Sequence, residues 1–121
     1  MSEQDGDREV LGNLARYGSD LSKPHHTVHY LYFKSEAGAQ AAASELRTEG
    51  YENVRVEREP APLLKRLFGP KEFSCLAETH AVPSEEAVFA TTDRMNDLAR
   101  RHGGMYDGWD AGIVKAARGE E

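Results

Sequence analysis

The sequence predicts an α+β domain, in which a four-stranded antiparallel sheet carries two helices on one face and a short helix comes first. Three observations lead to this prediction. Residues 25–33 are the longest run of β-branched, aromatic and aliphatic residues. Two stretches with helical spacing each begin at a serine, Ser35 and Ser84. After the first helix, strand-like and helical stretches follow each other in the order β-α-β-β-α-β.

The first 18 residues are interpreted as a polar tail followed by a short helix. Residues 1–7 are polar and are expected to be loosely held. Apolar side chains recur at helical spacing over residues 8–17, and Gly18 is placed to end the helix in a left-handed conformation. So short a helix is marginal alone, so its apolar stripe needs a surface to cover. The stripe includes Val10, Leu11 and Leu14.

Residues 25–33 are predicted to be a central strand, because both of their alternating sets are bulky. One set is Thr27, His29, Leu31 and Phe33, and the other is Val28, Tyr30 and Tyr32. The second set presents aromatic rings with hydroxyl tips, which suit a surface that meets a partner.

Ser35 is predicted to cap the helix that follows, and Gly50 to end it. Gly38 weakens its first turn by about 1 kcal/mol relative to Ala, a loss that packing must offset. Residues 51–58 alternate between apolar and charged side chains, as an edge strand does. The small inner stripe of the helix lets it lie close to the sheet, and is made of Ala39, Ala42, Ala43 and Leu46.

The second half of the chain repeats this pattern. Pro60 and Pro62 exclude a central strand, residues 73–81 return as a strand, and Ser84 caps a second long helix that ends at Gly103. Residues 105–114 are predicted to be the last strand. The buried stripe of the second long helix is expected to contain Val88, Thr92, Met95, Leu98, Ala99 and His102.

Two β-α-β units of this kind form a ferredoxin-like sheet, with the first and third strands central and the opposite face open. We assign residues 19–114 to this domain and residues 115–121 to a polar tail. The open face needs a cover, which is either the N-terminal helix or another molecule, at even odds. We also expect a single core containing Trp109, Leu31, Phe33, Phe73 and Met95.

Composition narrows the function. The formal net charge of −6 disfavours nucleic acid and anionic membrane surfaces as partners. Cys75 is the only cysteine, which excludes an internal disulfide and favours a reducing compartment. We interpret its side chain as an inert thiol in the core. The first residues resemble no secretory signal, and no apolar run could span a bilayer. We therefore expect a cytoplasmic protein.

Several short motifs together resemble the regulator of ribonuclease E activity B family. They are the segments 20–24 (DLSKP), 29–33 (HYLYF), 50–51 (GY) and 104–109 (GMYDGW), which spread over residues 19–114. The resemblance implies a ferredoxin-like fold and a small cytoplasmic protein without catalytic activity. Proteobacterial members of that family bind and inhibit the endoribonuclease that organises the RNA degradosome, so it also implies a protein partner of this kind.

The candidate partner-binding residues fall into two groups. The first lies in the loop between the middle strands and comprises Leu63, Leu64, Lys65, Arg66, Leu67 and Phe68; its prolines hold it outward and its basic residues suit an acidic surface. We rank this loop first. The second group shares the open face and comprises Tyr30, Tyr32, Leu76 and His80.

The remaining motifs have structural interpretations. Tyr106, Asp107, Gly108 and Trp109 are interpreted as a bulged strand with a core tryptophan. The scattered histidines predict no metal site, and no residue pattern indicates a cofactor or a catalytic centre.

One alternative to a protein-binding regulator is a single-stranded RNA binder that stacks bases on the open-face aromatics. Another is a ligand sensor or enzyme that uses Tyr30, Glu78 and His80.

Overall fold

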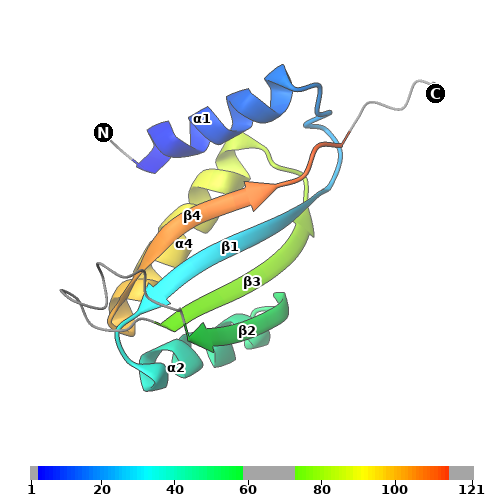
Figure 1. Cartoon of the computed structure of the whole chain (residues 1–121). Coiled ribbons are helices and arrows are strands. Elements are labelled where there is room, and N and C mark those ends of the chain that lie inside the picture. Colours follow the sequence, from blue (N-terminus) through cyan, green and yellow to red (C-terminus); the bar gives the residue numbers. More distant parts are fainter. Residues whose placement is uncertain (1–2, 59–72, 115–121) are drawn as a thin grey trace.

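The computed structural model describes residues 3–58 and 73–114. Its elements in chain order are α1 (Glu3–Arg16), β1 (His25–Phe33), α2 (Glu36–Thr48), β2 (Glu52–Arg58), β3 (Phe73–Ala81), α4 (Glu85–Arg101) and β4 (Gly104–Ala111). The strands form one antiparallel sheet in the order β2-β3-β1-β4, and α2 and α4 lie behind the same face of it (Figure 1). The predicted ferredoxin-like fold is confirmed, with β1 and β3 central.

Both predicted serine caps are confirmed. The Ser35 side chain accepts a hydrogen bond from the backbone N–H of Gly38 at 3.0 Å, and Ser84 accepts one from Ala87 at 3.2 Å. Each bond satisfies an N–H at the start of a helix that has no partner within the helix. The predicted inner stripe of α2 is fully buried, from Ala39 through Leu46.

The expectation of a single core is wrong, because the buried apolar residues form two clusters. Leu31, Phe33 and Met95 lie in the main cluster with Phe73 packed against it, whereas Trp109 packs with Leu11 and Leu14 of α1 in a second cluster. The reason lies along β1, whose buried face is aliphatic and aromatic at one end and polar at the other. The polar end consists of His25, Thr27 and His29, and Trp109 pairs with His29 there.

For residues 3–7, the expectation of a loosely held start of the chain is wrong. Helix α1 begins at Glu3, and Asp7 is buried, with its carboxylate accepting a hydrogen bond from the Trp109 indole N–H at 3.0 Å. This contact joins residues 102 apart in the chain, so no local pattern could indicate it. At the other end of α1, Gly18 adopts the predicted left-handed conformation, with φ of +91°.

Strand β4 contains the bulge that its glycine suggested. The register against β1 shifts between the pairs Tyr30–Gly108 and Leu31–Tyr106, and Gly108 has φ of +115°. Alternation alone would send Tyr106 and Trp109 to opposite faces, since they are three residues apart. The extra residue brings both toward the helix side. The strand ends at Ala111, earlier than predicted, and Gly112 follows it.

The close approach of α2 to the end of α4 depends on Gly38. A Cβ atom there would lie 2.5 Å from the backbone oxygen of His102, whereas Gly12 in α1 has open space around it. Gly38→Ala is therefore expected to lower the free energy of unfolding by about 1–3 kcal/mol through overpacking. Gly12→Ala is the matched control and should raise it by up to about 1 kcal/mol through helix propensity. Urea unfolding of both variants tests this; equal stabilisation by both would contradict it.

Candidate protein-binding surface

The sheet face opposite α2 and α4, which we call the open face, carries the predicted surface residues. Along β1 the odd-numbered residues are buried, while the even-numbered ones point to the open face and are half-buried or exposed. The antiparallel register sets Tyr30 opposite Leu76 and Tyr32 opposite Ser74 on β3. The open face comprises His26, Val28, Tyr30, Tyr32, Arg55, Leu76, Glu78, His80 and Met105.

The middle of the open face is apolar and aromatic. Tyr30 lies between Leu76 on β3 and Gly108 on β4, so its ring meets no side chain from the β4 side of its row. Next to it, Tyr32 pairs with Met105, which is 62% exposed. Exposed methionine next to tyrosine is a composition found where proteins meet partners.

A charged cluster borders this apolar strip and is centred on Glu78. Its carboxylate accepts hydrogen bonds from the His26 ring at 2.7 Å, from the Asn53 amide at 2.7 Å and from the Arg55 guanidinium at 2.8 Å. These bonds, the one from His26 foremost, lower the pKa of Glu78 to about 2. His80 completes the cluster, with its ring 4.9 Å from that of His26.

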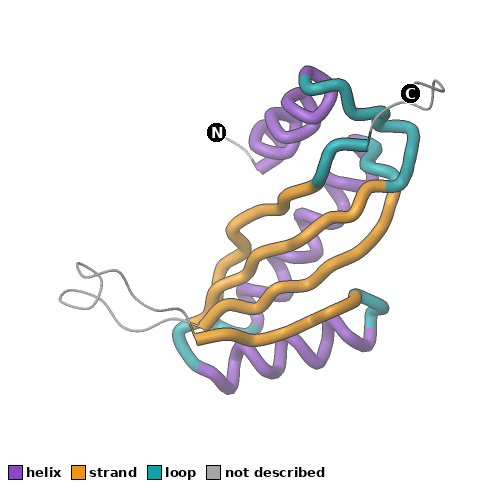
Figure 2. Tube along the Cα trace, turned by 45° about the vertical axis from the view of Figure 1, so that its right-hand side comes forward, coloured by secondary structure: helices purple, strands orange, loops and turns teal. Residues whose placement is uncertain are grey.

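Helix α1 does not cover the open face. Of the two covers considered for that face, the N-terminal helix is therefore excluded. Arg8 of α1 pairs with Glu85 at 3.5 Å and lies over the Phe89 ring of α4. Both views place α1 beside α4 and the β4 edge of the sheet, away from β2 (Figure 2). The first-ranked candidate group, residues 63–68, lies outside the described residues.

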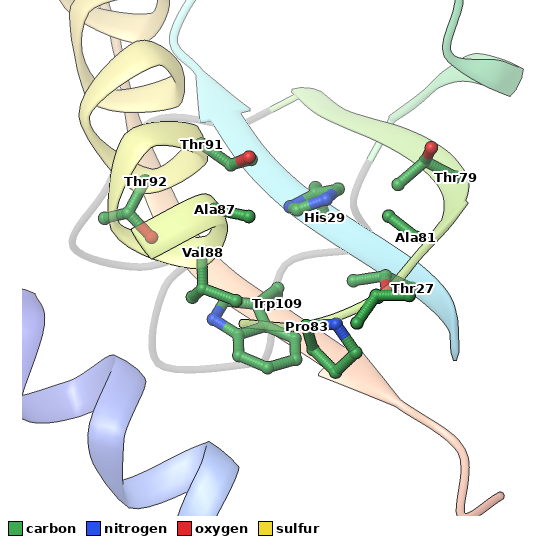
Figure 3. Close-up of a pocket in the computed structure, with 11 residues that line it drawn as sticks. Thr27, His29, Thr79, Ala81, Pro83, Ala87, Val88, Thr91, Thr92 and Trp109 are labelled. Carbon is green, nitrogen blue, oxygen red and sulfur yellow. The ribbon is translucent and has the colours of Figure 1, made fainter. Parts of the chain in front are cut away.

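The helix side of the sheet holds a small pocket of about 50 Å³ beneath α4, lined by His29, Thr27 and Trp109 among others (Figure 3). His29 is 4% exposed, and its Nδ1 is hydrogen-bonded to the Tyr106 hydroxyl at 2.9 Å. Burial lowers the pKa of His29 to about 4 and raises that of Tyr106 well above its usual range. The imidazole is thus neutral at physiological pH.

The histidines of β1 point to both faces of the sheet. His25 and His26 point to opposite faces of β1, as the alternation predicts, and His25 is held by the Ser19 hydroxyl at 2.6 Å and the Lys23 carbonyl at 2.8 Å. Within residues 3–58 and 73–114, no group of three or more His, Cys, Asp or Glu side chains could hold a metal ion. In the same ranges no helix is long and apolar enough to cross a membrane.

Sequence reasoning identified part of this surface. Alternation along β1 and β3 was enough to bring together Tyr30, Tyr32, Leu76 and His80. It missed Met105, although the same alternation along β4 would have indicated it. It also missed the contacts of Asn53 and Arg55 with Glu78, which depend on an irregularity in β2 where Asn53 has φ of +50°.

Comparisons with known proteins agree on one family. The family model described as "Regulator of ribonuclease activity B" matches residues 4–111. A relative of the same name from Actinobacillus succinogenes is 32% identical over 106 residues, which cover 84% of this chain and 68% of the relative. The match to the family model thus runs from the first turn of α1 to the end of β4.

Proposed function

The chain belongs to the regulator of ribonuclease activity B family, and we propose that it is a non-catalytic cytoplasmic protein that regulates an endoribonuclease by binding it. The endoribonuclease that organises the RNA degradosome is the partner we propose. The observation that carries this proposal is the open face, where tyrosine, leucine and methionine side chains lie together without a described helix over them.

The distribution of charge supports a protein partner. Because Glu78 already accepts hydrogen bonds from three side chains, its charge is compensated within the chain, and an approaching protein would not leave it unpaired. The apolar strip beside it offers Tyr30 and Leu76 as anchors. The loop at residues 63–68 adds Lys65 and Arg66, which would steer the chain toward an acidic surface.

The titratable groups support a role without catalysis. A general acid or base works best with a pKa near the working pH. Here the pKa values move away from neutrality: that of Glu78 falls to about 2, that of His29 falls to about 4, and burial raises that of Cys75 to about 11. In the candidate trio Tyr30, Glu78 and His80, the carboxylate of Glu78 would therefore be a poor general base at neutral pH.

Single-stranded RNA is the second candidate ligand, because Tyr30 and Tyr32 stand on a central strand as base-stacking aromatics do. The surrounding charge opposes it. Glu57 pairs with Ser74 and Asp110 pairs with Val28, so both carboxylates border the open face, and the net charge is −6. We therefore expect no RNA binding in a filter assay at physiological salt.

Two double variants locate the docking surface. We expect Leu67→Ser/Phe68→Ser to weaken binding to the purified endoribonuclease by at least tenfold, because apolar anchors dominate interface energies. Tyr30→Ala/Tyr32→Ala should weaken it by a smaller factor. Calorimetric titration gives the affinity, and cleavage of an RNA substrate gives the inhibition. Circular dichroism must first show that each variant is folded.

The control is Tyr17→Ala, which removes a tyrosine that is 69% exposed and lies outside both candidate groups. It should bind as the parent does. If only the open-face variant loses the partner, the loop is not the main docking site and our ranking is wrong. If the parent chain neither binds nor inhibits the endoribonuclease, the proposed function is wrong.

A further inference from the structure

A cavity of about 320 Å³ lies between α1, α4 and β4, away from the open face. Its lining brings together a carboxylate, an amide, a hydroxyl and two aromatic rings. The residues that supply these groups are Asp7, Asn96, Thr92, Tyr106 and Trp109. The space exceeds that of a few water molecules and stands near the lower limit of sites that hold small organic ligands.

The carboxylate of Asp7 is the unusual feature of this cavity. Asp7 is 5% exposed, and its Oδ1 accepts the Trp109 indole N–H at 3.0 Å, a contact that holds the group in one orientation. Its Oδ2 is enclosed and has no hydrogen-bond partner among the described residues. The Thr92 hydroxyl oxygen makes no well-formed hydrogen bond there either, although it lies close enough to the Tyr106 hydroxyl to lower the pKa of that group. Buried acceptors are nearly always paired, so these two require an explanation.

No cationic side chain lines the cavity within the described residues, whereas Asp107 adds a second carboxylate at its edge. The nearest cation in sequence, Arg8, is engaged by Asp5 and Glu85, each at 3.5 Å. Burial raises the pKa of Tyr106, and the neighbouring Asp7 charge raises it further. The cavity is therefore electronegative, and two of its N–H donors are already engaged: the Asn96 amide donates to the Thr92 backbone oxygen and the Trp109 indole to Asp7.

We propose that this cavity binds a guanidinium group, either on a free small molecule or on the arginine side chain of a peptide. A guanidinium carries a positive charge and five N–H donors in one plane, so one group could reach acceptors on both α1 and α4. Its flat face can also stack on the Tyr106 or Trp109 ring, a contact that aromatic walls favour for organic cations. This site does not depend on the ribonuclease role, since it lies on the helix side of the sheet.

The chain carries a built-in reporter, because Trp109 is its only tryptophan and its indole N–H contacts Asp7. We would titrate the ¹⁵N-labelled full chain with Nα-acetyl-arginine amide and follow the indole N–H resonance. A saturable shift is expected. The matching citrulline amide has the same shape but no charge, and it should bind at least tenfold more weakly. Equal effects of the two compounds, or no saturable shift, would overturn the proposal and leave a water-filled cavity.

Two variants test the acceptors. Asp7→Asn keeps an oxygen for the Trp109 N–H but removes the charge, so arginine amide should bind at least tenfold more weakly. Asp110→Asn removes an equal charge from an exposed position on β4, next to Trp109, and should bind as the parent does. Should Asp7→Asn fail to fold, Thr92→Val removes the second acceptor at constant volume and should weaken binding severalfold. If whichever of Asp7→Asn and Thr92→Val is folded binds arginine amide as the parent does, the proposed site is wrong.

A peptide arm identifies the source of the guanidinium group. A short peptide with one central arginine is titrated beside the amide. An affinity at least tenfold higher for the peptide supports a partner's arginine side chain as the natural ligand, and similar affinities support a free guanidine. Both results support the cavity as a guanidinium site, provided that each citrulline compound binds more weakly than the arginine compound of the same shape.

Discussion

Replacing Trp109 by Ala is expected to lower the free energy of unfolding by about 3–5 kcal/mol, a large share of the stability of a domain of this size. The ring is 9% exposed and packs with Leu11 and Leu14, so its loss leaves a void beneath α1. Its indole N–H also holds the Asp7 carboxylate, which would lose its remaining partner. Helix α1 should then detach, because it is too polar to be stable without its docking surface.

Two further variants divide this effect. Trp109→Phe keeps most of the ring volume but removes the donor to Asp7, and it should cost about 1–3 kcal/mol for the unpaired carboxylate. Met105→Ala removes an exposed side chain from the same strand and should change stability by less than about 0.5 kcal/mol. Thermal and urea unfolding give the free energies, and hydrogen exchange along residues 3–16 reports on α1. A Trp109→Ala protein that melts within a degree or two of the parent would show that the ring does not hold α1.

Acid should weaken the fold through His29. The pKa of this buried imidazole is about 4 in the folded chain, against 6.5 for an ordinary histidine. Between these values the unfolded chain binds the proton and the folded chain does not, so stability falls as the pH falls from about 6.5 to 4. The loss amounts to about 3 kcal/mol over this range. Above pH 7 the residue contributes no pH dependence, because it is neutral in both states.

His29→Asn tests this directly. The Asn amide can replace Nδ1 as the hydrogen-bond partner of the Tyr106 hydroxyl, while it cannot bind a proton in this range. The variant should be less stable than the parent at pH 7 because it fills less space, yet lose most of the acid dependence between pH 6.5 and 4. His80→Asn, which removes a 59% exposed ring from β3, should keep the acid dependence. Parallel pH profiles for the parent and His29→Asn would refute the assignment.

Local patterns were enough to predict the elements themselves. The bounds of β1 and β3 agree with the alternating runs at 25–33 and 73–81, and both long helices begin after the serines expected to cap them. These features depend on neighbours within four residues, which the sequence displays directly. The topology followed because few arrangements satisfy the handedness of two β-α-β units.

The candidate surface was predictable only where alternation extends across adjacent strands. Tyr30 and Leu76 face each other because β1 and β3 pair, and their period of two then decides the face. Alternation grouped Glu78 with Tyr30 and His80 but indicated none of its hydrogen-bond partners. Its partner Arg55 comes from β2, whose pairing with β3 is irregular, and no local signal specifies such a register.

The spacing of apolar residues along the chain is enough to tell which side of each element is apolar, including the stripe of α1. What that stripe covers depends on the three-dimensional packing. A short amphipathic helix can pack on any apolar surface within reach, and the choice depends on contacts made across the whole chain. Here the bulge at Gly108 turns Trp109 to the helix side, where Asp7, 102 residues away, accepts its N–H. That contact holds α1 beside α4, leaves the open face without a helix, and encloses the carboxylate whose second oxygen is unpaired.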